Sequence, residues 1–210
     1  NNGVPNNLDD QSFNKILEQR ENSNIVNVLY LSNMMKEKGY DIALKLAKDL
    51  LLDGVRHVNF NFAGGWATQK DKDFFHSYIK EHDLETKVKY HGLVSGDKKF
   101  NLFSSANMFI FPTNYKKEVF PLSILEALSY GLPVLTFNKG AISKLINKNI
   151  GIITDEKNIF DDFNIITKDY LNSNGYKLCR NTFLENYTNE VFEANLAIIL
   201  KGEYLGNCTD

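Results

Sequence analysis

The sequence predicts one α/β domain built on a Rossmann-like, doubly wound parallel sheet. Two observations predict it: short β-rich runs alternate with helical patterns along the chain, and the runs are almost continuously apolar. Unbroken apolar strands are expected where helices cover both faces of a parallel sheet. The expected strands are residues 25–32, 57–63, 87–91, 107–112, 132–137 and 150–154.

Two of the segments between these strands have apolar residues at helical spacing. They are residues 40–53, with Ile42, Leu46, Leu50 and Leu51, and residues 70–83, with Phe74, Phe75, Tyr78 and Ile79. Ligands of such sheets bind beyond the carboxyl ends of the strands. Five residues lie at or just past the expected strand ends or in the loops after them, where a ligand would approach the backbone closely: Gly39, Gly64, Gly92, Pro112 and Gly140.

Composition excludes several classes of protein. With 210 residues, of which 43 % are hydrophobic, the chain can bury a sizeable core. The formal net charge of −2, with both signs interspersed, gives no electrostatic footprint for nucleic acid. Cys179 and Cys208 lie in dissimilar surroundings and support neither a disulfide framework nor a metal site. No apolar run is long enough to span a membrane, so we expect a cytoplasmic protein.

The most informative segment runs from Glu118 to Glu126. Pro121 suits the first helical position, because its missing N–H would be unpaired there anyway, and apolar residues follow at helical spacing. A helix is therefore expected to begin near Phe120. Glu118 would lie in the loop before this helix, and Glu126 about two turns inside it, roughly 8 Å further along at 1.5 Å per residue.

The start of this helix is a candidate anion site flanked by carboxylates. The amides of Leu122 and Ser123 and the Ser123 hydroxyl would face a ligand, and the helix dipole favours an anion such as phosphate. Glu118 and Glu126 accept hydrogen bonds but do not donate them, so each needs hydroxyl donors, which sugars supply in vicinal pairs. The alternative is that both glutamates merely complement the helix dipole and face solvent.

The ordered set of motifs resembles the C-terminal, donor-binding domain of the retaining glycosyltransferases of family 4, which have the two-domain GT-B fold. The resemblance covers nearly the whole chain. It includes Asn2-Gly3-Val4-Pro5 at the start and Lys36-Glu37-Lys38-Gly39 after the first strand. The further matching segments are residues 28–32, 60–65, 88–92, 106–113, 118–135 and 139–142.

The resemblance implies a role for each candidate residue. Glu126 would hold the ribose of a nucleoside diphosphate sugar, Glu118 the hexose, and Lys38, as a catalytic cation, the diphosphate together with the amides that follow Pro121. Backbone at Gly92 and Val94 would meet the nucleobase. The family usually has an arginine where this chain has Asn33, so one expected diphosphate cation is missing and donor affinity is in question.

The resemblance also implies the domain organisation. Residues 1–24 would lead in from an N-terminal domain that carries most of the acceptor site, residues 25–187 would form the donor domain, and residues 188–210 a C-terminal helix and tail. This last helix would pack toward the missing domain and expose apolar surface here, inviting self-association. Its pattern is Tyr187, Val191, Phe192, Leu196, Ile199 and Leu200.

The predicted function is transfer of a hexose, with retention, from a UDP- or GDP-linked donor to a hydroxyl acceptor, which for the family means a glycan or lipid-linked acceptor. The full-length enzyme would then work in the cytoplasm, with peripheral association at the inner face of the plasma membrane. No metal and no cofactor besides the donor substrate are expected. Two alternatives stay open: a non-catalytic sugar-nucleotide-binding domain, and a GT-B sugar-nucleotide epimerase.

Overall fold

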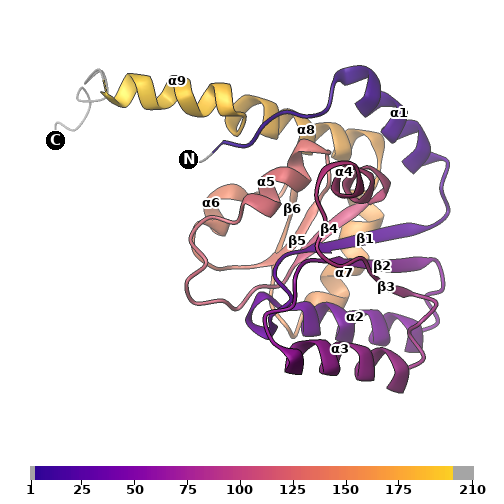
Figure 1. Cartoon of the computed structure of the whole chain (residues 1–210). Coiled ribbons are helices and arrows are strands. Elements are labelled where there is room, and N and C mark those ends of the chain that lie inside the picture. Colours follow the sequence, from indigo (N-terminus) through magenta and orange to yellow (C-terminus); the bar gives the residue numbers. More distant parts are fainter. Residues whose placement is uncertain (1–2, 201–210) are drawn as a thin grey trace.

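A single sheet of six parallel strands, in the order β3-β2-β1-β4-β5-β6, organises the chain in a computed structural model that describes residues 3–200 (Figure 1). The chain begins in the middle of the sheet, runs outward to β3, and returns to β4 beside β1. This reversal is the topological switch point at which doubly wound sheets bind ligands. The strands are β1 (Val26–Leu31), β2 (Val58–Ala63), β3 (Val88–Tyr90), β4 (Met108–Phe111), β5 (Val134–Phe137) and β6 (Gly151–Thr154), so all six predicted strands are confirmed.

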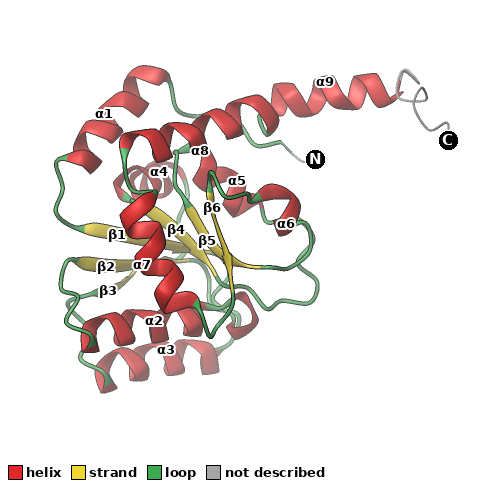
Figure 2. Cartoon of the chain, turned by 180° about the vertical axis from the view of Figure 1, so that it is seen from behind, coloured by secondary structure: helices red, strands yellow, loops and turns green. Residues whose placement is uncertain are grey.

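Helices cover both faces of the sheet, as the unbroken apolar strands predict (Figures 1 and 2). One face is covered by α2 (Tyr40–Leu52), α3 (Gln69–Glu81) and α7 (Ile159–Asp169). The other is covered by α1 (Asp10–Glu21), α4 (Gly96–Ser105), α5 (Leu122–Ser129), α6 (Ile142–Leu145) and α8 (Ser173–Asn186). The two helices predicted over residues 40–53 and 70–83 are confirmed as α2 and α3.

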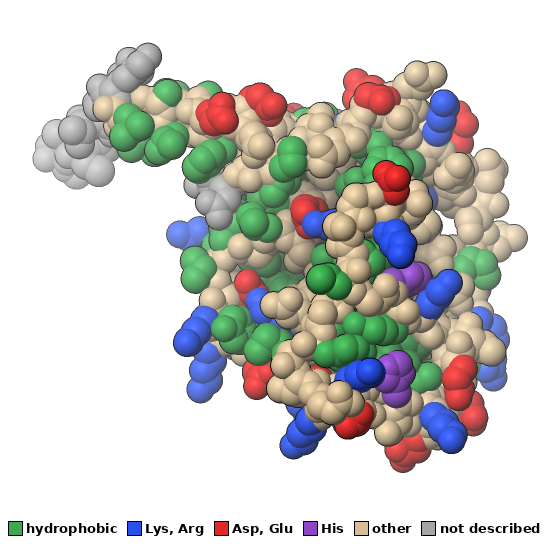
Figure 3. All heavy atoms as spheres, in the orientation of Figure 1, with side chains coloured by type: hydrophobic (Ala, Val, Ile, Leu, Met, Phe, Trp, Pro, Cys, Tyr) green, Lys and Arg blue, Asp and Glu red, His purple; other side chains and the backbone are tan. Residues whose placement is uncertain are grey.

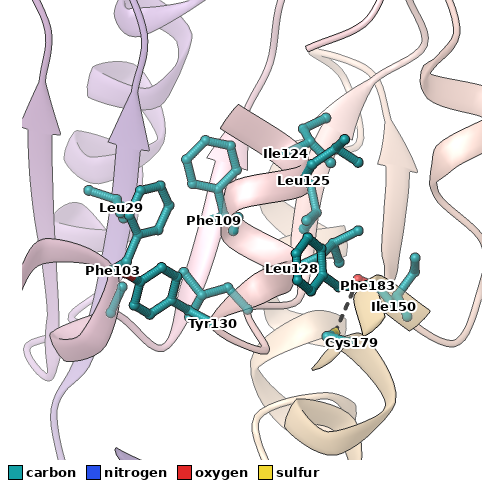
Figure 4. Packing of buried hydrophobic residues seen from close by; sticks show 14 of the residues in the cluster. Leu29, Phe103, Phe109, Ile124, Leu125, Leu128, Tyr130, Ile150, Cys179 and Phe183 are labelled. Carbon is teal, nitrogen blue, oxygen red and sulfur yellow. Dashed lines mark hydrogen bonds between the residues drawn. The ribbon is translucent and has the colours of Figure 1, made fainter. Parts of the chain in front are cut away.

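The buried face of helix α5 packs against the hydrophobic core. Its Leu125 and Leu128 are fully buried and lie near Phe109 of β4 and Phe183 of α8 (Figure 4). Its C-terminal carbonyl, Ser129 O, accepts a hydrogen bond of 2.6 Å from Arg180 of α8. A cation at a helix C-terminus complements the helix dipole. The first turn of α5 is consequently held in place by contacts that leave its N-terminus open.

The loops at the carboxyl ends of β1 and β4 lie directly against each other. Gly39, between the 3₁₀ turn η1 (Lys36–Lys38) and α2, has the left-handed φ of +85°. A Cβ on Gly39 would lie 2.1 Å from Pro112 O, in the loop after β4. Only glycine permits both this backbone conformation and this approach. The contact brings Lys38 next to the loop that contains Glu118.

The C-terminal helix α9 (Asn189–Leu200) extends away from the body of the domain (Figure 1). Helices α8 and α9 are separated at Thr188, which forms a β-bridge with Val4. Tyr187 is buried at the C-terminal end of α8, so the prediction that it belongs to the last helix is wrong. The exposed apolar surface predicted for α9 is confirmed, since Ile199 and Leu200 are 57 % and 77 % exposed (Figure 3). Self-association through it stays a prediction.

The predicted domain boundaries at residues 24 and 187 also stay predictions. Helix α1 belongs to the body of the domain by its packing, because Phe13, Ile16 and Leu17 are buried in the core. None of the helices within residues 3–200 has the length and apolar character needed to cross a membrane. Asn2 and Cys208, which entered the predictions above, lie outside the described residues.

Candidate functional site

The N-terminus of α5 offers free backbone donors at the carboxyl edge of the sheet. Pro121 occupies the cap position with extended backbone (φ −76°, ψ 104°), and its carbonyl accepts from Ile124 N at 3.1 Å. The amides of Leu122 and Ser123 precede that bond and belong to the first turn, where amides have no partner inside the helix. Within residues 3–200 no side chain caps this helix. The arrangement suits an anion.

The helix starts later than the sequence predicted. The expectation that Pro121 is the first helical residue is wrong, because Leu122 is. The fixed φ of proline fits both the cap and the first helical position, so only ψ decides between them. Glu126 is accordingly the fifth residue of α5, just over one turn inside it, and the predicted depth of two turns was too large.

Glu118 forms a buried ion pair with Lys38. The Nζ atom of Lys38 donates to Glu118 Oε2 at 2.6 Å, and the two side chains are only 14 % and 8 % exposed. The ammonium also lies 4.6 Å from the centre of the Tyr115 ring. The backbone carbonyl of Lys38 accepts from the Tyr30 hydroxyl at 3.2 Å. Lys38 is therefore held by a carboxylate, an aromatic face and its own loop.

The loop that carries Glu118 rests on the loop after β5. Ala141 N donates to Val119 O at 2.9 Å. Gly140 has a left-handed φ of +54°, and a Cβ there would lie 2.0 Å from Glu118 O. The close contact at Gly140 thus fixes the position of the Glu118 backbone, and the backbone position determines where the Glu118 carboxylate lies.

Glu126 is paired with a lysine that the sequence reasoning missed. Lys99, in the first turns of α4, donates from Nζ to Glu126 Oε1 at 2.6 Å. This pair is more open than the first, with side chains 31 % and 29 % exposed. Residues 99 and 126 lie on different helices, and no local pattern links them. The signal available was Ser95, a favourable cap residue that predicts a helix beginning just before Lys99.

A cavity of about 270 Å³ adjoins this second pair. Its walls come from the N-terminal segment, from α4 and from α5, and they include Pro5, Gly96, Phe100, Glu126 and Tyr130. The rings of Phe100 and Tyr130 meet edge to face with centres 5.7 Å apart. The cavity joins an apolar, aromatic wall to the Lys99–Glu126 pair, a combination typical of small-molecule sites.

The other predicted contacts lie along the same edge of the sheet. Gly92 follows β3, and its carbonyl accepts from Gly64 N at 2.8 Å, while Val94 packs its side chain against the core. A Cβ on Gly92 would meet nothing within 4 Å, so space lies open beside it. Asn33 follows β1 with an exposed side chain. The nucleobase and diphosphate roles of these residues stay predictions.

Two aromatic residues near the edge have structural roles. Trp66 packs its ring on Tyr90, with ring centres 4.5 Å apart, and lies against the hydrophobic core. His91 Nε2 lies 2.8 Å from Asn61 Oδ1. Burial, and secondarily the charge of Lys89, lowers the pKa of His91 from its ordinary value. A neutral, bonded histidine agrees with a structural role.

Metal-ligand chemistry has no recognisable place in the described part of the chain, where His, Cys, Asp and Glu form no group of three suited to an ion. The charges at the candidate site are two carboxylates, two ammonium groups and one helix N-terminus. Together they can bind a ligand that carries both phosphate and hydroxyl groups.

Solved structures of GT-B glycosyltransferases share this fold over about half of their length. The structure of Anabaena HepE with UDP and glucose matches with a TM-score of 0.78 at 18 % identity, over 95 % of this chain and 55 % of that one. A glycosyltransferase of Rickettsia africae matches with a TM-score of 0.73 at 20 % identity, over 98 % of this chain and 56 % of that one.

The family follows from the sequence comparison. The profile described as "Glycosyl transferases group 1" matches residues 10–181, and the chain belongs to this family, the retaining glycosyltransferases of family 4. Curated relatives include the alpha-galactosylglucosyldiacylglycerol synthase of Streptococcus pneumoniae, 29 % identical over 110 residues, which are 51 % of this chain and 27 % of that protein. Protein CapJ of Staphylococcus aureus is 26 % identical over 147 residues, 70 % of this chain and 35 % of that protein. The matched parts of the chain therefore span 27 % and 35 % of these two relatives and about half of the matched structures.

Proposed function

We propose that this chain is the donor-binding half of a retaining hexosyltransferase and that its substrate is a nucleoside diphosphate hexose. The observation that carries the proposal is the pair of glutamates on either side of the open N-terminus of α5. Glu118 and Glu126 can each accept hydroxyl hydrogen bonds, and the Leu122 and Ser123 amides between them can hold phosphate. A sugar nucleotide has its groups in this order: hydroxyls, diphosphate, hydroxyls.

In this proposal Glu126 binds the ribose and Glu118 the hexose. Lys38, together with the two amides, receives the diphosphate. During transfer the bond between the anomeric carbon and the phosphate oxygen breaks, and the diphosphate leaves with that electron pair. The acceptor hydroxyl oxygen bonds to the anomeric carbon and passes its proton to the oxygen of the departing diphosphate. Fixed donors around the leaving group stabilise the charge that develops on it, without a metal ion.

Uridine nucleotides are the first donors to test. The matched structures of Anabaena HepE contain UDP or UDP-glucose, which supports a uridine donor, and GDP-linked sugars are the second choice. The acceptor would be a surface glycan or a lipid-linked sugar reached from the cytoplasmic face of the membrane. Relatives named for O-antigen and glycolipid synthesis support this acceptor class. An N-terminal domain would supply most of its binding site.

A non-catalytic nucleotide-sugar-binding domain is the second candidate. The exposed, neutral Asn33 favours it, because the family places a guanidinium at that position and a neutral amide holds phosphate more weakly. An epimerase would need an acid or base pair near the sugar carbon, and the described residues offer no such pair beyond Glu118 and Lys38.

Competitive titration of UDP, GDP and ADP by calorimetry tests binding, and an assay with the natural full-length protein tests transfer. We expect one nucleotide to bind the 210-residue chain weakly and no transfer by this chain alone, because acceptor positioning is missing. Binding without transfer by the full-length protein favours the non-catalytic alternative. Interconversion of the donor sugar favours the epimerase. Absence of nucleotide binding at millimolar concentration refutes the proposal.

A further inference from the structure

We infer that Lys99 is a second diphosphate-binding cation that changes partner when the donor binds. In the structure it neutralises Glu126. With a nucleoside diphosphate in place, its ammonium group turns to the phosphate next to the ribose, and Glu126 turns to the ribose hydroxyls. This inference rests on the proposed function, because it assigns a role within the same site.

The Lys99–Glu126 pair is built to separate. One oxygen of Glu126 takes the ammonium, and within residues 3–200 neither side chain has another hydrogen-bond partner. Both side chains are about 30 % exposed, so water can replace either partner. A lysine is a point charge on a flexible four-carbon stem and keeps its donors while it changes direction.

The Lys38–Glu118 pair is less exposed than the Lys99–Glu126 pair, and its lysine has more contacts. Lys38 and Glu118 are about half as exposed or less, and Lys38 also lies over the rings of Tyr115 and Phe111, with centres 4.6 and 5.7 Å away. That ammonium group is held on several sides. Lys99 has no ring against it among the described contacts. It is therefore the cation with freedom to follow a ligand.

The dimensions of the site allow the exchange. Glu126 lies four residues after Leu122 on α5, about 6 Å along the helix at 1.5 Å per residue. A ribose bonded to Glu126 thus puts its phosphate near the free amides of the first turn, within reach of an ammonium group that starts 2.6 Å from the Glu126 carboxylate. Lys99 and Glu126 both line the 270 Å³ cavity, so the core does not enclose either side chain on that side.

Charge balance gives the exchange its direction. The Lys99–Glu126 pair is neutral, since one ammonium group cancels one carboxylate. A diphosphate adds several negative charges close to Glu126, and an unpaired carboxylate would repel them. Asn33 has no charge to offer. If Lys99 moves to the phosphate, the carboxylate gains hydroxyl donors and the phosphate gains a cation, so every charged group keeps a partner.

The test compares UDP with uridine, which lacks the phosphates, in the wild type, Lys99→Met and Lys98→Met. Lys98 is an exposed neighbour on α4, so its replacement makes the same change of charge outside the site. Affinities are measured by calorimetry for UDP and by NMR titration for uridine. In Lys99→Met we expect UDP to bind about tenfold more weakly, as for loss of one charged hydrogen bond. Uridine should bind as well as before or a few-fold better, because Glu126 no longer has a competitor.

The outcomes separate this inference from the proposed function. Lys98→Met should leave both affinities unchanged, and Lys99→Arg should restore most of the UDP affinity. Equal weakening of UDP and uridine in Lys99→Met would overturn the inference, since it would mean that Lys99 only orients Glu126. Unchanged UDP affinity would also overturn it. A wild-type chain that binds no UDP would refute the proposed uridine donor, and the inference with it.

Discussion

Replacing Glu126 with alanine should affect ligand binding and folding in ways that follow directly from the contacts of this residue. The change removes the carboxylate expected to bind the ribose, and it leaves Lys99 without its partner. Glu126 lies on the partly exposed side of α5, away from the buried Leu125 and Leu128. Binding and folding should therefore respond very differently to the same substitution.

The expected loss of binding follows from the hydrogen bonds removed. A hydrogen bond to a charged group contributes about 1.5 to 3 kcal/mol, which is roughly a ten- to hundredfold change in the dissociation constant. The partly exposed ion pair with Lys99 contributes about 0 to 1 kcal/mol to the free energy of unfolding. A change of about 1 kcal/mol moves Tm by roughly 2 to 4 °C in a chain of this size.

Calorimetry with UDP and 2′-deoxy-UDP measures the ribose contact directly. The wild type should prefer UDP about tenfold, because the deoxy ligand lacks one of the two hydroxyls. Glu126→Ala should abolish that preference, and since both ligands carry the same phosphates, any effect of the unpaired Lys99 cancels. Glu81→Ala removes an exposed carboxylate on α3 and serves as the control. A preference that survives in Glu126→Ala would refute the ribose assignment.

Three further substitutions test the rest of the site. Glu118→Ala should weaken binding of UDP-glucose far more than binding of UDP, and it should lower the free energy of unfolding by about 2 kcal/mol in chemical denaturation, because Lys38 stays buried without its carboxylate; equal loss for both ligands would contradict the hexose assignment. Asn33→Arg should tighten UDP binding several-fold and steepen its salt dependence, and unchanged affinity in a folded variant would mean that position 33 does not face the diphosphate. Gly140→Ala should displace Glu118 and weaken UDP-glucose binding, whereas Gly54→Ala, which has the same left-handed backbone but no atom within 4 Å of the added Cβ, should leave it unchanged; similar affinities in the two variants would argue against this loop contact.

The parallel sheet and its six strands could be predicted from the sequence, because a strand buried on both faces appears as a continuous apolar run. β4 illustrates this: Met108 and Ile110 pack on one face and Phe109 and Phe111 on the other. The order of the strands came from the structure. Helix ends were harder. At Pro121 the sequence constrains φ but leaves ψ open, and ψ decides where α5 begins.

The ion pairs could not be predicted, because they depend on contacts between distant segments. Lys38 and Glu118 are 80 residues apart and meet only because Gly39 lets two loops touch. Lys99 was harder to identify for a second reason. Helix α4 starts at Gly96, and because glycine is a weak helix former, the sequence gives no strong helical pattern in the first turns of α4. The sequence singled out Glu118, Glu126 and Lys38, and the structure showed that Lys38 pairs with Glu118 and added Lys99 beside Glu126.

A crystal structure of the chain soaked with UDP is the most direct test that the N-terminus of α5 is the donor site. The account predicts the diphosphate on the Leu122 and Ser123 amides, the ribose hydroxyls on Glu126, and Lys99 turned from Glu126 to a phosphate oxygen. UDP bound at another place on the molecule, or a ribose that makes no contact with Glu126, would contradict it.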